Sequence, residues 1–347
     1  MKKITSLLLL AALCITGCKK SDLPQGNNKT TTTTTVNSDT SFVKGADVSW
    51  LTQMEASGYK FYNSSGTQQD CLQILKAKGM NAIRLRVWVN PSTGWCNNAD
   101  LVVKAKRASA LGMKVLVDFH YSDIWADPGI QTKPAAWASM DFNTLVTTVH
   151  DYTKSVIDTL IANGVTPYWA QVGNEVSNGM LWDDGKASGN MANFAALVTA
   201  GYNGVKDASS TTKVIIHLAN GYDNTTYRWL FDGLKSNGAK WDIIGMSLYP
   251  TASNWQTYNT QCLANMNDMI SRYGTPVMIC ETGFNVADPT TAKAFLTDLI
   301  AKTKSVSNNN GLGVFYWEPE AYNWMSYGMG AFDNTGRPTT ALDAFAN

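Results

Sequence analysis

The amino-acid sequence predicts an α/β protein folded as a single (β/α)8 TIM barrel, and two observations support this fold class. From residue 43 onward a short β-branched or apolar run recurs roughly every 30 to 50 residues, and an amphipathic stretch of helix length follows each run. Eight such units are present, which is the number that closes a parallel sheet into this barrel. An open doubly wound sheet is the main alternative, but no glycine-rich dinucleotide motif follows the first run.

The predicted strands are the short apolar runs, and the predicted helices lie between them. In chain order the strands cover residues 43–48, 81–88, 113–120, 166–173, 213–218, 242–248, 275–280 and 312–317. Helical spacing of apolar residues is found over residues 67–79, 98–111, 142–163, 190–208, 225–237, 257–273, 289–305 and 338–345. Glycines occupy the places where helix C-caps belong, shortly before the next strand, at Gly79, Gly112, Gly164, Gly238 and Gly274.

The N-terminal segment has the pattern of an export signal, which we place at residues 1–17. Two lysines precede an apolar run from Leu7 to Leu13 that is too short to span a bilayer permanently. The run closes on Ile15-Thr16-Gly17-Cys18, which resembles a bacterial lipobox and predicts acylation of Cys18. An ordinary signal peptide with a chance cysteine is the alternative. We therefore expect an exported lipoprotein anchored at the outer membrane, the cell surface or the periplasmic side.

Residues 18–42 are polar and rich in Ser and Thr, so we expect a flexible tether before a barrel domain at residues 43–347. The chain has 28 Lys and Arg against 27 Asp and Glu, a formal net charge of +1, which argues against nucleic acid as a partner. Membrane contact is expected only through the lipid. No coenzyme motif is present, and nothing calls for an oligomer, so we expect a monomer without a cofactor.

Removal of the signal leaves four cysteines in the barrel, Cys71, Cys96, Cys262 and Cys280. No C-x-x-C or His-rich spacing predicts zinc. In an oxidising compartment we expect the disulfides Cys71–Cys96 and Cys262–Cys280, because Cys280 should alternate against its neighbours and face the helix layer. Four buried free thiols are the alternative.

The C-terminal ends of barrel strands carry the chemistry in this fold, and here they are polar and aromatic. The residues at or just after these ends are Asp47, Arg84, Arg86, Trp88, Asp118, His120, Tyr121, Trp125, Asn174, Glu175, His217, Tyr249, Glu281 and Trp317. A single polar residue at a strand end is usually structural. Such residues on all eight strands indicate a substrate site.

Two glutamates define the expected chemistry, because strands four and seven face each other across the barrel mouth. Glu175 ends the fourth strand and Glu281 the seventh, and such a carboxyl pair is what glycoside hydrolysis requires. One group must stay protonated while the other is ionised. Arg84 and Tyr249 would hold Glu281 as a carboxylate, whereas Glu175 has no such partner in sequence.

Aromatic residues indicate the substrate class. Eight of the twelve tryptophans fall at or shortly after strand ends, namely Trp50, Trp88, Trp95, Trp125, Trp182, Trp255, Trp317 and Trp324. Aromatic faces stack on sugar rings, so a polysaccharide groove is expected, although several of these rings will serve barrel packing.

These residues belong to segments that resemble family 53 glycoside hydrolases over residues 43 to 345. The segments are Gly45-Ala46-Asp47-Val48-Ser49-Trp50, Arg84-Leu85-Arg86-Val87-Trp88, Asp118 to Asp123 with Trp125 to Gly129 and Pro134 to Trp137, Gln171 to Glu175, and Glu281-Thr282-Gly283. The resemblance implies a retaining endo-β-1,4-galactanase that cleaves galactan and type I arabinogalactan. It further implies that Glu175 is the acid/base and Glu281 the nucleophile, with Arg84, His120, Asn174, Tyr249 and Trp317 around the bound sugar. Retention requires carboxyl groups about 5 to 5.5 Å apart.

Some members of this family hold calcium in a long loop after strand seven. Here only residues 284–288 separate that strand from the next helix, so no metal is expected. Within the enzyme class, a mannanase, cellulase or xylanase of the same clan is the alternative.

Two other functional classes have less support in the sequence. A metal-dependent barrel hydrolase could use His120 and His217, but the first strand lacks the usual His-x-His. A non-catalytic sugar-binding surface lipoprotein would have lost a carboxylate, and both glutamates are present.

Overall fold

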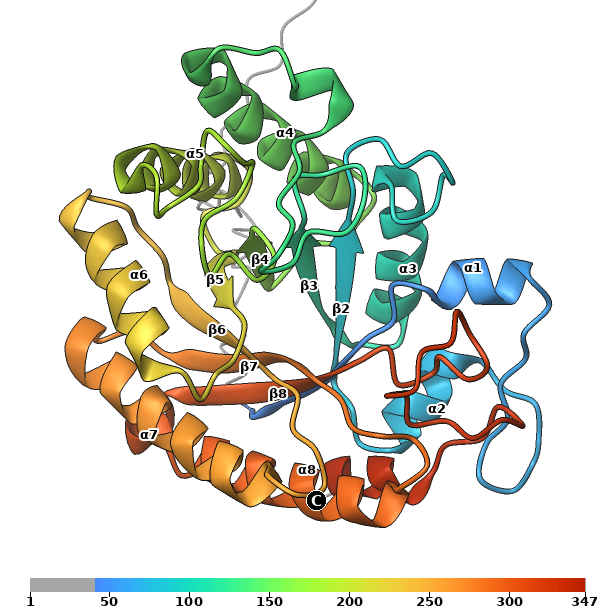
Figure 1. Ribbon diagram of the computed structural model, residues 1–347. Helices are drawn as coiled ribbons and strands as arrows, with labels where there is room; N and C mark the ends of the chain where they lie inside the picture. The colour runs from blue at the N-terminus through green and yellow to red at the C-terminus, as the bar shows by residue number, and fades with distance from the viewer. Residues whose placement is uncertain (1–40, 347) are drawn as a thin grey trace, which may run out of the picture. The chain divides into compact units, whose positions relative to one another are not determined.

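The computed structural model describes residues 41–346, and in this range eight parallel strands form one closed barrel with helices around it (Figure 1). Each strand pairs with the next along the chain, and the last pairs with the first. The strands are β1 (Val43–Asp47), β2 (Ala82–Val87), β3 (Lys114–Phe119), β4 (Trp169–Val172), β5 (Lys213–Leu218), β6 (Ile243–Leu248), β7 (Val277–Thr282) and β8 (Gly311–Trp317). The predicted (β/α)8 barrel is confirmed.

The predicted signal peptide, Cys18 and the tether up to residue 40 lie outside the described residues. Within residues 41–346 no helix is both long and apolar enough to cross a membrane.

The helices surround the barrel in the expected order. They are α1 (Leu51–Ala56), α2 (Cys71–Ala77), α3 (Asn98–Ala110), α4 (Phe142–Ala162), α5 (Met191–Ala208), α6 (Asn224–Ser236), α7 (Trp255–Tyr273) and α8 (Pro289–Lys304), with 3-10 helices η1 (Ala135–Trp137), η2 (Ser307–Asn309) and η3 (Thr340–Phe345). The five glycines expected at helix ends all have positive φ, a conformation that glycine adopts without a steric cost.

Most helices lie within two residues of the prediction, and three of them differ more or in kind. The stretch expected over 67–79 begins at Cys71, because the Asp70 side chain accepts a hydrogen bond from the Gln73 amide and caps the helix there. The last helix is the 3-10 helix η3, and α1 is a short helix that the periodicity did not reveal.

The barrel interior consists of an apolar floor with polar residues above it. The floor is formed by Val43, Ala82, Leu116, Trp169, Ile215, Ile243, Met278, Cys280 and Phe315. Strand side chains alternate between two faces, so the residues two positions further along also point inward. These are Arg84, Asp118, Gln171 and His217, which are all fully buried. The fold thereby places the candidate residues in one layer under the mouth of the barrel.

A β-bulge in β7 changes this alternation beside the candidate nucleophile. Met246 of β6 pairs with Ile279, and the next β6 residue, Ser247, pairs with Glu281, so Cys280 is an extra residue in β7. Ile279 packs outward between the strands and helices, whereas Cys280 lies in the apolar floor. Cys280 faces inward by alternation with Met278, and the bulge turns Glu281 toward the inside of the barrel as well.

The four cysteines of the barrel do not form the predicted disulfides. Among the described residues Cys71, Cys96, Cys262 and Cys280 are all free, buried thiols. Cys262 packs in the outer layer, so the barrel wall separates it from Cys280. Cys96 Sγ contacts the Ser49 carbonyl oxygen at 3.5 Å, while Cys71 packs in the outer apolar layer. Both predicted pairs are wrong.

Candidate active site

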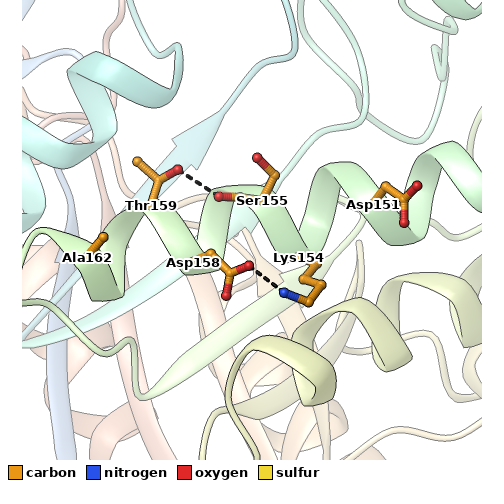
Figure 2. A pocket seen from close by; sticks show the side chains of 6 residues that line it. All are labelled: Asp151, Lys154, Ser155, Asp158, Thr159 and Ala162. Carbon is orange, nitrogen blue, oxygen red and sulfur yellow. Dashed lines mark hydrogen bonds and ion pairs between the residues drawn. The ribbon is translucent and has the colours of Figure 1, made fainter.

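A cavity of about 570 Å³ opens at the C-terminal ends of the strands. It is lined by Trp50, His120, Trp125, Ala126, Asp127, Asn174, Glu175, Tyr249, Glu281, Trp317, Met325, Ser326 and Tyr327. A second depression lies along the exposed face of α4 (Figure 2), where Lys154 pairs with Asp158 on the same helix. Only the first depression gathers acidic, amide and aromatic groups from many strands.

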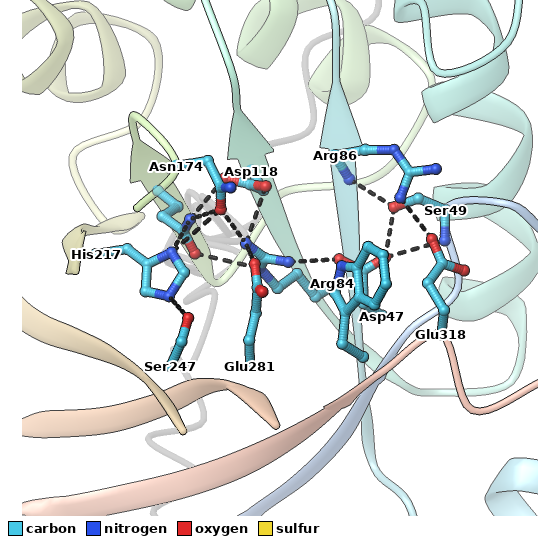
Figure 3. A network of polar contacts seen from close by, with 12 residues as sticks. Asp47, Ser49, Arg84, Arg86, Asp118, Asn174, His217, Ser247, Glu281 and Glu318 are labelled. Atoms are coloured by element: carbon cyan, nitrogen blue, oxygen red, sulfur yellow. Dashed lines mark hydrogen bonds and ion pairs between the residues drawn. The ribbon is translucent and has the colours of Figure 1, made fainter. Parts of the chain in front are cut away.

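Arg84 on β2 organises the buried layer beneath this cavity (Figure 3). Its guanidinium reaches five side chains: Asp47 at 2.6 Å, Asp118 at 2.9 Å, Glu281 at 2.7 Å, Asn174 at 2.8 Å and Gln171 at 3.2 Å. Burial opposes the charge of Arg84, but Asp118, Glu281 and Asp47 outweigh it and raise its pKa. Arg84 is therefore a fixed cation that connects both candidate strands.

Glu281 has two partners that stabilise its ionised form. Arg84 forms an ion pair with one carboxyl oxygen, and the Tyr249 hydroxyl donates to the other at 3.0 Å. Burial raises the pKa of Glu281 to about 8 against the effect of Arg84, and the Glu175 carboxylate raises it further. The sequence correctly predicted both partners.

Glu175 has a different environment. Its backbone adopts the left-handed conformation with φ of 46°, in the loop that follows β4. Burial raises its pKa, and a hydrogen bond from the Ser247 hydroxyl partly opposes this. The two glutamates therefore share one proton near neutral pH, and their partners decide which group carries it. Because Glu281 has an ion pair and Glu175 only a neutral donor, the proton resides on Glu175.

A chain of neutral groups orients Glu175 from behind. His217 Nδ1 lies 2.8 Å from Gln171 Nε2, an obligate donor, so Nδ1 accepts and the ring proton sits on Nε2. His217 Nε2 then donates to Ser247 Oγ at 2.7 Å. Burial, together with Arg84, lowers the pKa of His217 well below its ordinary value. His217 is therefore a neutral hydrogen-bonding group that fixes the Ser247 hydroxyl.

His120 is fixed in the same way. Its Nδ1 accepts from the Trp88 indole N–H at 3.2 Å and from the Ala126 amide at 3.1 Å. Its Nε2 lies 3.0 Å from Asp118 Oδ2. Both ring nitrogens of His120 and His217 are thus engaged by protein groups. Within residues 41–346 no cluster of three or more His, Cys, Asp or Glu side chains is arranged to hold a metal ion.

Aromatic rings form one wall of the cavity. Trp50 packs edge-on against Trp125 at 5.7 Å, Trp317 at 5.1 Å and Tyr327 at 5.6 Å between ring centroids. Trp125 remains 37% exposed although it touches several of these rings. The wall therefore presents apolar ring surface next to the glutamates, as sugar binding requires.

The predicted site residues fall into two groups. Those that line the cavity are Glu175, Glu281, His120, Trp125, Asn174, Tyr249 and Trp317. Those placed behind the lining are Asp47, Arg84, Arg86, Trp88, Asp118 and His217, all of them fully buried except the half-buried Trp88. The second group supports the lining residues and does not form the cavity surface.

Several residues of the site were not predicted. Gln171 and Ser247 belong to the buried network, and both lie in predicted strands at inward positions, so the alternation carried a signal for them. Asp127 lines the cavity from the loop after β3, and Met325 to Tyr327 line it from the loop after β8. The latter loop has no pattern that reveals its position.

The family model that matches this chain is described as Glycosyl hydrolase family 53 and covers residues 43–345. A protein of Neosartorya fischeri named probable arabinogalactan endo-beta-1,4-galactanase A is 37% identical over 330 residues, which cover 87% of this chain and 92% of that protein. A solved fungal beta-1,4-galactanase is 31% identical with a TM-score of 0.81 and covers 88% of this chain and 99% of its own. The Ignisphaera aggregans GH53 catalytic domain is 30% identical with the same TM-score, over 88% and 96%. This chain therefore belongs to glycosyl hydrolase family 53.

Proposed function

We propose that this protein is an endo-β-1,4-galactanase that cleaves galactan and type I arabinogalactan with net retention at the anomeric carbon. The observation that carries this proposal is the pair of glutamates in one cavity, with an ion pair on Glu281 and only neutral donors on Glu175. The name of the Neosartorya fischeri relative supports the same substrate.

The reaction proceeds in two displacements. In the first, the Glu281 carboxylate attacks the anomeric carbon while Glu175 gives its proton to the departing glycosidic oxygen, which forms a galactosyl ester. In the second, Glu175 removes a proton from water, the water oxygen attacks the anomeric carbon, and the Glu281 carboxylate is released. We predict a carboxyl separation of about 5 to 5.5 Å, as this mechanism needs.

The coupling between the two carboxyl groups serves both steps. A charged Glu281 favours the protonated form of Glu175, which is the acid needed first. Once Glu281 is an uncharged ester this effect disappears, and the pKa of Glu175 falls. Glu175 is then ready to act as the base in the second step.

A substrate panel tests the proposal. Purified protein, with and without a chelator, is incubated with potato or lupin galactan, mannan, cellulose and xylan, and new reducing ends are measured. We expect cleavage of galactan alone, unaffected by the chelator, with oligosaccharides as early products. Cleavage of another glycan instead would favour a different clan glycanase, and binding without cleavage would indicate a sugar-binding protein.

We further propose that the protein is exported and anchored through a lipid on Cys18. Support comes from the apolar run at residues 7–13 and the lipobox-like residues 15–18. Cys18→Ala should release soluble enzyme or block processing. An unchanged membrane fraction for this variant would contradict the proposal.

A further inference from the structure

Arg86 is a buried cation that the reaction above does not use. It is 1% exposed and lies on β2, two residues beyond Arg84 and on the same inward face. One guanidinium nitrogen, Nη1, pairs with Glu318 (Figure 3), but Nε and Nη2 are buried without any hydrogen-bond partner. Buried donors without partners are costly, so their surroundings must compensate.

Three indole rings surround this guanidinium. Its central carbon lies 4.4 Å from the Trp125 ring centroid and 5.2 Å from those of Trp50 and Trp88. Attraction between a desolvated cation and aromatic faces is of the size that offsets missing hydrogen bonds. The two unpartnered nitrogens are therefore explained by the tryptophans around them.

Glu318 anchors the guanidinium through its ion pair with Nη1. It follows β8 directly, is fully buried, and also accepts the Trp50 amide N–H at 3.1 and 3.2 Å. Glu320 is fully buried as well, and no donor holds either of its oxygens, so it stays protonated. Burial and Glu318 raise the pKa of Glu320 accordingly. The negative charge of this pair thus stays on Glu318, next to Arg86.

Trp125 is the ring that most needs such support. It lies in the loop after β3, lines the cavity, and is far more exposed than Trp50. An exposed ring at the end of a loop loses conformational entropy when a sugar stacks on it. A fixed cation behind the ring removes part of that cost before the substrate arrives.

We propose that Arg86, held by Glu318, is a positioning residue that acts through Trp125 and Trp50 to preorganise the aromatic wall for galactan. Arg86 is buried behind the lining residues. This inference rests on the proposed galactanase function. It concerns polysaccharide binding and leaves the bond-breaking step with Glu175 and Glu281.

The double variant Arg86→Gln/Glu318→Gln tests this inference, because it removes both charges together and leaves no unpaired buried ion. We expect the KM for galactan to rise on the order of tenfold while kcat changes little. The matched control is Arg107→Gln/Glu55→Gln, a surface pair with a 2.7 Å contact away from the cavity, which should change neither constant.

The same double variant is then made in a Trp125→Ala background. Because Arg86 acts through this ring, its removal should raise the KM by a clearly smaller factor there than in the wild-type background. Equal factors in the two backgrounds, or an unchanged KM in the first, would overturn the inference. Inactive wild-type protein would instead refute the galactanase proposal.

Arg86→Lys alone is the second variant if the double variant fails to fold, since it keeps a positive charge for Glu318 but loses the planar guanidinium that lies against the indole rings. A higher KM with an unchanged kcat is again expected, and an unchanged KM overturns the inference. Thermal unfolding of each variant establishes that the barrel is intact.

Discussion

Glu175 and Glu281 receive different donors, and this difference makes two chemically similar side chains separable by experiment. Arg84 and Tyr249 hold the ionised form of Glu281, while Ser247 alone donates to Glu175. The charge needed for attack and the proton needed for departure are thereby placed on separate groups.

Replacement of each glutamate by alanine should give distinct results. Glu281→Ala removes the nucleophile, so hydrolysis of galactan and of aryl galactosides should both fall by about a thousandfold or more. Glu175→Ala should lower galactan hydrolysis by about 10² to 10⁴, yet still release an activated aryl group, which needs no proton. Steady-state and burst kinetics measure both, and Glu55→Ala is the control. Equal losses on both substrates for both variants would contradict the assigned roles.

Ser247→Ala should shift the pH profile in a defined direction. The Ser247 hydroxyl stabilises ionised Glu175, so its loss raises the pKa of Glu175 further. Glu175 then stays protonated to higher pH. We expect the alkaline limb of kcat/KM to move upward, and Ser253→Ala, an exposed serine after β6, should leave it in place. A downward shift would contradict the hydrogen-bond direction.

How far the sequence predicted these residues depends on the signal that each one carries. Glu175, Glu281 and Arg84 stand at strand ends inside short motifs, so strand position was enough to find them. Glu318 and Glu320 also follow a strand, but their sequence does not distinguish a buried acid from a solvated loop carboxylate. Only the packing around Arg86 gives them a role.

At the scale of the element, β7 departs from the alternation that sequence reasoning assumed. Cys280 was expected to face outward between inward Ile279 and Glu281, but Met278 and Cys280 both lie in the floor while Ile279 faces outward, and the bulge turns Glu281 inward as well. Bulges depend on pairing with both neighbouring strands, which a single sequence does not contain. Strand positions and helix ends were predictable because apolar runs and glycines are local signals. The direction of the Cys280 side chain was not predictable from such signals.

The bulge requires space, and Gly245 on β6 provides it. A Cβ at this position would lie 2.8 Å from Cys280 Sγ and 2.8 Å from Ile215 Cγ2. Gly245→Ala should therefore reduce the free energy of unfolding by about 1 to 3 kcal/mol, measured by urea titration. It should also lower activity, because Glu281 is the next residue after Cys280.

Two further variants separate the clash from other effects of the alanine. Adding Cys280→Ala to Gly245→Ala removes one of the two contacts and should restore part of the lost stability. Gly328→Ala, where nothing lies within 4 Å of the added atom, should be nearly neutral. A fully stable Gly245→Ala variant would show that the floor of the barrel has room that the structure does not indicate.

At the scale of the whole molecule, the barrel buries several carboxyl groups, although no group of acidic, His or Cys side chains within residues 41–346 is arranged to hold a metal ion. Glu281, Glu318 and Glu320 are all at least nine-tenths buried. Two arginines neutralise part of this charge, and shared protons neutralise the rest. A buried polar layer of this kind has a fixed geometry but lowers the free energy of unfolding. Packing of the apolar floor and of the outer helix layer must compensate for this loss of stability.

This burial predicts how stability depends on pH. Burial raises the pKa values of both carboxyl pairs, Glu175 with Glu281 and Glu318 with Glu320, so near neutral pH each pair binds a proton that the unfolded chain has already lost. Because the unfolded state binds fewer protons than the folded state, the free energy of unfolding falls as pH rises. His217, whose pKa is lowered, acts in the opposite direction only below about pH 6.5, where the unfolded imidazole becomes charged.

We therefore expect the free energy of unfolding to decrease by about 1 to 3 kcal/mol between roughly pH 6.5 and 8.5, measured by urea titration. Glu320→Gln should flatten this decrease, because it removes a proton that the folded protein binds at Glu320 and the unfolded chain has already lost. Asp141→Asn, which changes an exposed helix cap, should leave the slope unchanged. A stability that rises over this interval would mean that the buried carboxyl groups are ionised in the folded protein, and it would remove the shared proton on which the assignment of Glu175 as the acid depends.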